Sequence, residues 1–196
     1  YMQLILNTSR SSLLNSATTN CSLIPPLAVQ LISLTDALCN GQASGSVEVE
    51  ALGGQPGYLY SIDGGPAQAT GLLTGLFPGP HFITITDANN NITSIDITIG
   101  EPPILEAFQT GQVDPSCFDS TDGFLSADAI GGTPGYLFSL DGGPAQANGN
   151  FPQITGGFHT ITVQDANNCF SFLNINLPTP PPIVTITQET QDVLCN

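Results

Sequence analysis

Hydrophobic and polar residues alternate along several short segments of the chain, which is the pattern of a half-buried β-strand. In residues 47–50, Val47 and Val49 are predicted to face a core, while Glu48 and Glu50 face water. Other segments repeat this alternation with the following apolar residues: Tyr58, Tyr60 and Ile62; Ile83 and Ile85; Ile95, Ile97 and Ile99; Tyr136, Phe138 and Leu140; Ile161 and Val163; Leu173, Ile175 and Leu177. The pattern predicts short strands with one buried face.

The segments between these strands are rich in turn-forming residues. They contain Gly-Gly, Asp-Gly-Gly, Pro-Gly and Asp-Ala-Asn-Asn, which favour tight turns over continued helix or strand. No part of the repeated region keeps a period of 3.6 residues. Strands of five or six residues at this spacing predict an all-β chain built from small β-sandwiches of about seven strands each.

The chain repeats itself with an offset of 78 residues. Residues 36–103 align without a gap on residues 114–181, with about 30 identities in 68 positions. The counterpart of 47–50 is 125–128, where Leu125 and Ala127 are predicted to face inward and Ser126 and Asp128 outward. Self-similarity at a fixed period is the signature of tandem structural units.

The period also suggests where the units begin and end. We expect repeats at 25–102 and 103–181, each ending in a proline-rich joint that stiffens the chain into a rod. Residues 1–24 do not align and are either a separate N-terminal segment or the end of a preceding unit. Residues 182–196 are either the first strand of a third unit or a strand donated to a neighbouring molecule. We expect the chain to be a fragment or a processed piece of a longer protein.

The strongly acidic composition of the chain argues against nucleic acids and anionic membranes as partners. The 196 residues include 16 acidic residues but only one cationic residue, Arg10, and the formal net charge is −15. Nucleic-acid binding and anionic membranes both require clustered Lys and Arg, so neither is expected. No apolar run approaches the roughly 20 residues that span a bilayer, and the first residues do not form a signal peptide.

Few residues suggest chemistry. His81 and His159 occupy the same repeat position, and catalysis would have to be duplicated, so we expect two hydrogen-bonded strand histidines and no enzyme. Four aspartates near turns are able to ligate Ca²⁺, but the same residues also form Asx turns without a metal, which is the interpretation we favour. These aspartates are Asp63, Asp87, Asp141 and Asp165. We expect no other cofactor.

The combination of these motifs resembles a known family. A cysteine is followed by Gly-Gly-x-Pro-Gly-Tyr (residues 53–58 and 131–136), Asp-Gly-Gly and Gly-x-His-x-Ile-Thr, and then by Asp-Ala-Asn-Asn (87–90 and 165–168). This order is similar to the SprB-type repeat of very large secreted surface proteins of gliding bacteria. The resemblance implies immunoglobulin-like sandwiches in an extracellular adhesin, without catalytic residues.

The resemblance also implies a pairing of cysteines. Cys117 and Cys169 occupy the positions that the family pairs, so we expect a disulfide between them. Cys39 lacks this partner because position 91 holds Asn, and Cys21 is the remaining candidate to bond with it. Cys195 is left over, which suggests a partner in a following unit or in another molecule.

Three functions remain open at this stage. The favoured one is a structural and adhesive module of a cell-surface protein, whose partners are neighbouring repeats and possible surface glycans. The second is a subunit of an extracellular filament that joins copies of itself by adding the strand in 183–196 to a neighbour. The third is a carbohydrate- or ligand-binding sandwich, against which the absence of Trp counts.

Overall fold

The computed structural model describes residues 24–184, and this part of the chain contains twelve β-strands and no helix. It therefore has no helix long and apolar enough to cross a membrane. The strands are β1 (Ala28–Thr35), β2 (Gly45–Leu52), β3 (Leu59–Ile62), β4 (Leu72–Leu76), β5 (Gly79–Thr86), β6 (Ile92–Ile99), β7 (Glu106–Val113), β8 (Gly123–Ile130), β9 (Leu137–Leu140), β10 (Asn150–Ile154), β11 (Gly157–Gln164) and β12 (Phe170–Leu177).

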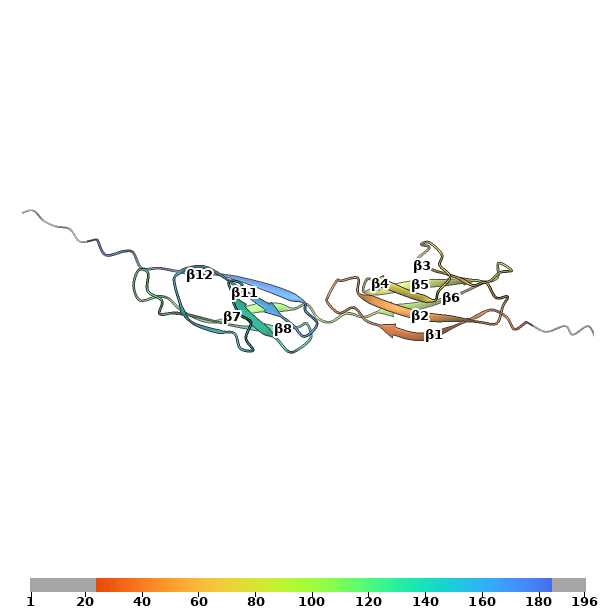
Figure 1. Ribbon diagram of the computed structural model, residues 1–196, viewed down its shortest axis with the longest axis horizontal. Coiled ribbons are helices and arrows are strands. Elements are labelled where there is room, and N and C mark those ends of the chain that lie inside the picture. The colour runs from red at the N-terminus through yellow and green to blue at the C-terminus, as the bar shows by residue number, and fades with distance from the viewer. Residues whose placement is uncertain (1–23, 185–196) are drawn as a thin grey trace, which may run out of the picture. The chain divides into compact units, whose positions relative to one another are not determined.

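The strands form four three-stranded sheets, two in each sandwich, and both sandwiches have the same strand order. Sheets β1-β2-β4 and β3-β5-β6 make the first sandwich, and sheets β7-β8-β10 and β9-β11-β12 make the second (Figure 1). In the second sandwich β11 pairs with β12 over its whole length and is antiparallel to both of its neighbours. The predicted class, all-β with tandem immunoglobulin-like sandwiches, is confirmed, although each sandwich has six named strands rather than about seven.

The core lies between the two sheets of each sandwich, and most of its residues are those that the alternation predicted, although Leu73 of β4 and Phe151 of β10 were not. In the second sandwich Leu125, Ile161 and Val163 are completely buried, and Phe138 and Leu177 pack in the same cluster. The corresponding residues of the first sandwich, among them Val47, Ile83 and Ile85, are equally buried. Burial of the inward faces of strands such as β2, β5, β8 and β11 holds the two sheets of each sandwich together.

Ser126 is an exception to the predicted alternation, because it is buried although we expected it to face water. The reason is a register shift in β7 between Gln109 and Gly111, which places Gly111 opposite Ser126. Thr110 Oγ1 donates a hydrogen bond to Ser126 Oγ at 2.8 Å. The buried hydroxyl is therefore satisfied, as buried polar groups must be.

Two compact units can be distinguished. One contains the described part of Tyr1–Leu34 together with Val47–Leu73 and Pro80–Thr98. The other contains Thr35–Ser46, Thr74–Gly79 and the described part of Ile99–Asn196. The second unit thus includes the loop between β1 and β2 as well as all of β7–β12. The expectations for residues 1–23 and 185–196, with Cys21 and Cys195, lie outside the described residues.

Candidate interaction sites and the disulfide

Each histidine is bound to an aspartate of a neighbouring hairpin. His81 Nδ1 lies 2.7 Å from Asp63 Oδ2, and His159 Nδ1 lies 2.7 Å from Asp141 Oδ2. The second oxygen of each aspartate accepts a backbone N–H, from Phe82 in the first sandwich and from Thr160 in the second. The two Asp-Gly-Gly turns are therefore held to β5 and β11 by the same pair of hydrogen bonds.

Both ring nitrogens of His159 face hydrogen-bond acceptors. Its Nε2 lies 2.9 Å from the carbonyl oxygen of Thr155, which can only accept, and Asp141 on the other side also only accepts. These two acceptors favour the protonated form of the ring. Burial alone would lower the pKa of His159, but the hydrogen bonds to Asp141 and Thr155 and the Asp141 charge outweigh it and raise the pKa.

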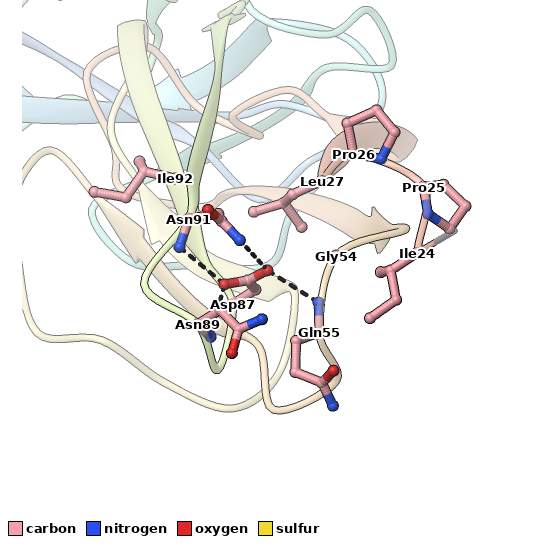
Figure 2. Close-up of a pocket in the computed structure, with 10 residues that line it drawn as sticks. All are labelled: Ile24, Pro25, Pro26, Leu27, Gly54, Gln55, Asp87, Asn89, Asn91 and Ile92. Carbon is pink, nitrogen blue, oxygen red and sulfur yellow. Dashed lines mark hydrogen bonds between the residues drawn. The ribbon is translucent and has the colours of Figure 1, made fainter. Parts of the chain in front are cut away.

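The turn that begins at Asp87 is organised around the buried carboxylate of Asp87 itself (Figure 2). One oxygen accepts the backbone N–H groups of Asn89 and Asn91 at 2.9 and 2.8 Å. The other accepts the backbone N–H of Gln55 and the side-chain amide of Asn91, both at 2.9 Å. These donors, foremost the Asn91 amide, lower the pKa of Asp87 to about 2.

A cavity of about 380 Å³ lies beside this turn in the first unit. Figure 2 shows Pro26 and Leu27 on one side of it and Asn91 and Ile92 on the other. Its walls are apolar side chains and turn amides that are already bonded to Asp87. The cavity therefore offers shape and a small apolar surface rather than free charged groups.

Asp165 organises the same turn in the second sandwich. Its Oδ1 accepts the backbone N–H groups of Asn167 and Cys169, and its Oδ2 accepts that of Thr133. In the described part of the chain no three His, Cys, Asp or Glu residues come together as a metal site would require. Asp87 and Asp165 accept the backbone N–H two residues further on, as in an Asx turn, whereas Asp63 and Asp141 accept N–H groups from β5 and β11.

The disulfide joins Cys39 to Cys169, and Cys117 is a free, exposed thiol. The expected pairs Cys117–Cys169 and Cys21–Cys39 are therefore wrong. Cys39 belongs to the first sequence repeat and Cys169 to the second, and both lie in the second compact unit. Among the described residues this is the one disulfide, and it joins positions 130 residues apart in the sequence.

The length of one strand explains why Cys117 and Cys169 do not pair. Cys169 directly precedes β12, whereas Cys117 lies beside Pro180–Ile183, which follow the end of β12. The eight residues of β12 span roughly 26 Å at about 3.3 Å per residue. A disulfide needs Cα atoms within about 7 Å, so the two cysteines of one repeat are too far apart.

Sequence reasoning missed the residues that hold the loop of Cys39 in place. Asn40 Nδ2 donates to the carbonyl of Pro102 at 3.0 Å, and the backbone N–H of Gly41 donates to the Glu101 carboxylate. Asn167 Nδ2 donates to the carbonyl of Leu38 at 3.0 Å. The presence of Asn91 at the position equivalent to Cys169 was the available signal, because it shows that Cys39 has no partner in its own repeat.

Comparisons with known proteins give a family and several distant structures. The model of the SprB repeat matches residues 31–67 and 110–145. No curated protein matches the chain. A C-terminal 282-residue fragment of intimin, crystallised with the intimin-binding domain of the translocated intimin receptor, is 13% identical with a TM-score of 0.41. That match covers 76% of this chain and 64% of the intimin fragment.

Two further structures are more distant. A structure described as the basis of Dscam isoform specificity is 11% identical, with a TM-score of 0.32 over 79% of this chain and 46% of that one. The complex of Dpr11 IG1 with DIP-gamma IG+IG2 is 9% identical, with a TM-score of 0.27 over 78% and 98%. The family match covers the loop of each repeat cysteine and the Gly-Gly-x-Pro-Gly-Tyr turn in both copies. The chain therefore contains two SprB repeats, one in each sandwich.

Proposed function

We propose that the chain is a structural and adhesive module of an extracellular bacterial cell-surface protein, without a catalytic role. The observation that carries this proposal is the SprB repeat itself, present twice in one chain. The second copy reproduces the strand order, the aspartate-centred turns and the His–Asp pair of the first. Such duplication adds length and surface, whereas an active site gains nothing from being copied at a fixed interval.

The chemistry of the side chains supports the same role. His159 is held between two acceptors, and Cys117, the free cysteine of the described residues, accepts a hydrogen bond from Ser116 Oγ. The net charge of −15 suits a well-solvated protein surface. The Cys39–Cys169 bond is typical of proteins exposed to an oxidising compartment.

Localisation can be tested with antibodies raised against the chain. Immunogold labelling of intact cells that produce the protein is expected to place gold outside the outer surface, with equal counts before and after permeabilisation. Antibodies against a periplasmic protein serve as the control and label only permeabilised cells. Labelling by the chain antibody only after permeabilisation would contradict an extracellular role.

Adhesion can be tested separately with Fab fragments of the same antibodies. We expect several-fold fewer cells to attach to glass when the Fab covers the repeats, and no change with a Fab against a different surface protein. If surface labelling is present but attachment is unchanged, the chain is a spacer and the adhesive part of the proposal fails. Beads coated with the purified chain then show whether glycans compete for the same surface.

A further inference from the structure

The Cys39–Cys169 disulfide lies in a cleft of about 320 Å³ whose lining comes from two parts of the sequence. One part is the cysteine loop, with Cys39 and Asn40, together with the joint residues Ile104 and Leu105. The other part is the turn that begins at Asp165, represented by Asn168–Phe170. All of these residues belong to the second compact unit.

A second cleft, of about 430 Å³, lies one repeat further along the chain. Its lining includes the equivalents, 78 positions later, of the cysteine loop and joint residues of the first cleft. Cys117, Phe118, Pro182 and Ile183 stand where Cys39, Asn40, Ile104 and Leu105 stand in the first cleft. Within residues 24–184, nothing in this second cleft corresponds to the Asn168–Phe170 turn. The cleft thus has the cysteine loop and the joint but lacks the turn.

The loop around Cys117 already has the conformation of the bonded loop. The backbone N–H of Ser120 donates to the carbonyl of Cys117 at 3.2 Å, and that of Gln42 donates to the carbonyl of Cys39 at the same distance. Asp119 has a φ of 58° and its counterpart Gly41 has a φ of 70°. A non-glycine residue with positive φ is uncommon, so the fold maintains this loop shape although glycine has been replaced.

We propose that this cleft is a docking site for the Asp-Ala-Asn-x-Cys turn of the next SprB repeat, and that Cys117 forms a disulfide with the cysteine of that turn. The two thiols lose two protons and two electrons, which a disulfide oxidant such as oxidised glutathione takes up as it becomes two thiols. The proposal goes beyond the proposed function and rests on the equivalence of the two clefts, so it stands even if the chain is not adhesive.

The occupant is identified by sequence and by one hydrogen bond. Residues 192–195, Asp-Val-Leu-Cys, follow Asp114-Pro-Ser-Cys117 by 78 positions and so begin a further copy of the repeat. In the first cleft Asn167 of the turn donates to the carbonyl of Leu38. The counterpart of Leu38 is Ser116, so the incoming turn is expected to donate from its own Asn to the carbonyl of Ser116.

The turn of the first sandwich shows that the turn keeps its shape when the cysteine is replaced by Asn. Asn91 stands where Cys169 stands, yet the backbone N–H of either residue donates to the turn aspartate at 2.8 Å. The shape of the turn is therefore independent of the cysteine. Docking and covalent closure are separable properties, and a variant with Asn in place of Cys should retain the first and lose the second.

The test inserts a second copy of residues 105–182 between Pro182 and Ile183 of the full chain, with Cys21→Ser and Cys195→Ser. Five cysteines remain: Cys39, Cys117, Cys169 and the two inserted counterparts of Cys117 and Cys169. After refolding in a glutathione redox buffer, mass spectrometry counts the thiols that react with an alkylating reagent. We expect one reactive thiol in this chain and two after Cys117→Ser at the original position.

Other pairings give other counts. Three reactive thiols in the first chain would mean that the inserted turn does not bond. None after Cys117→Ser would mean that the inserted repeat pairs its own two cysteines. Replacing the inserted counterpart of Cys169 by Ser should leave two reactive thiols, and a count of zero would show Cys117 bonded to its own inserted counterpart. A count of three in the first chain, of zero after Cys117→Ser, or of zero in this last variant would each overturn the proposal.

Docking is tested by the rate of bond formation. Replacing the inserted counterpart of Asn167 by Ala removes the expected hydrogen bond to Ser116 and should slow closure several-fold, while the final thiol count stays the same. As a matched control, Asn89→Ala makes the same change in the turn of the first repeat and should leave the rate unchanged. Equal rates for all three chains would mean that proximity alone drives the bond and that the cleft does not bind the turn.

Discussion

At the scale of single residues, the most important groups are aspartates that accept several backbone N–H groups at once. Asp87 and Asp165 are almost fully buried, and neither is paired with a cation in the described part of the chain. Their charge is balanced by amide donors, which also fix the turn between β5 and β6 or between β11 and β12. A chain with a single Arg in its sequence satisfies its buried carboxylates with backbone donors.

Removing one such acceptor should be costly. Asp165→Ala leaves the backbone N–H groups of Thr133, Asn167 and Cys169 without their acceptor, so we expect the free energy of unfolding to fall by about 3 kcal/mol. Urea denaturation measures the change. Asp96→Ala, at an exposed position of β6, is the control and should change stability by less than about 0.5 kcal/mol. Equal effects of the two variants would contradict the role given to Asp165.

The Asp141–His159 pair should make stability depend on pH. The folded state raises the pKa of His159, so its contribution is complete below the ordinary value of 6.5 and is lost as the pH rises through the folded pKa. Burial works against ionisation of Asp141, but its hydrogen bonds to His159 and Thr160 and the His159 charge lower its pKa. Its contribution is therefore present above 3.8 and is lost as the pH falls.

His159→Gln tests this pH dependence. Between about pH 4 and pH 6.5 we expect the variant to be less stable than the natural chain by about 0.5–1 kcal/mol, since Asp141 is partly exposed to solvent. The difference should shrink as the pH rises to 8, which thermal unfolding across the pH range can follow. Asp141→Asn should remove the same dependence. Parallel curves for the natural chain and His159→Gln would refute it.

At the scale of strands and turns, sequence predicted the central strands better than the irregular ones. β2, β5 and β11 alternate because one face is buried and the other faces water, and β8 does so apart from Ser126. β1 was missed because nearly all of its residues are exposed, so burial imposes no alternation on it. β10 was missed because Pro152 and the positive φ of Gln153 interrupt it with a bulge.

Two physical causes require glycine in these elements, lack of space for a Cβ and a positive φ, and alanine substitutions should distinguish them. A Cβ on Gly149 would lie 1.9 Å from the carbonyl oxygen of Ala127, where β8 faces the loop that leads into β10. Gly142 has open space around it, but its φ is 74°. We expect Gly149→Ala to lower the free energy of unfolding by about 3 kcal/mol and Gly142→Ala by about 1 kcal/mol. The reverse order in denaturant titrations would show that backbone conformation outweighs the clash.

At the scale of the whole molecule, the period was visible in the sequence, but the partners of its cysteines were not. Cys117 and Cys169 are 52 residues apart, and the bonded pair Cys39 and Cys169 differs from them by one period, so spacing alone cannot choose between these pairs. The choice depends on the length of β12, which separates the two cysteine positions within one repeat. That length becomes decisive only once the strand is placed in its sheet.

The bonded pair predicts how the chain responds to force. Because Cys39 and Cys169 are covalently joined, the 130-residue separation between them cannot be extended when the ends of the chain are pulled. Reduction should release roughly 450 Å of additional contour length, at about 3.5 Å per residue, in single-molecule pulling. Cys39→Ser should show the long extension with or without reductant, whereas Cys117→Ser should behave like the natural chain. If the oxidised natural chain extended as far as Cys39→Ser, the Cys39–Cys169 bond would be absent from the natural chain, which would contradict this prediction.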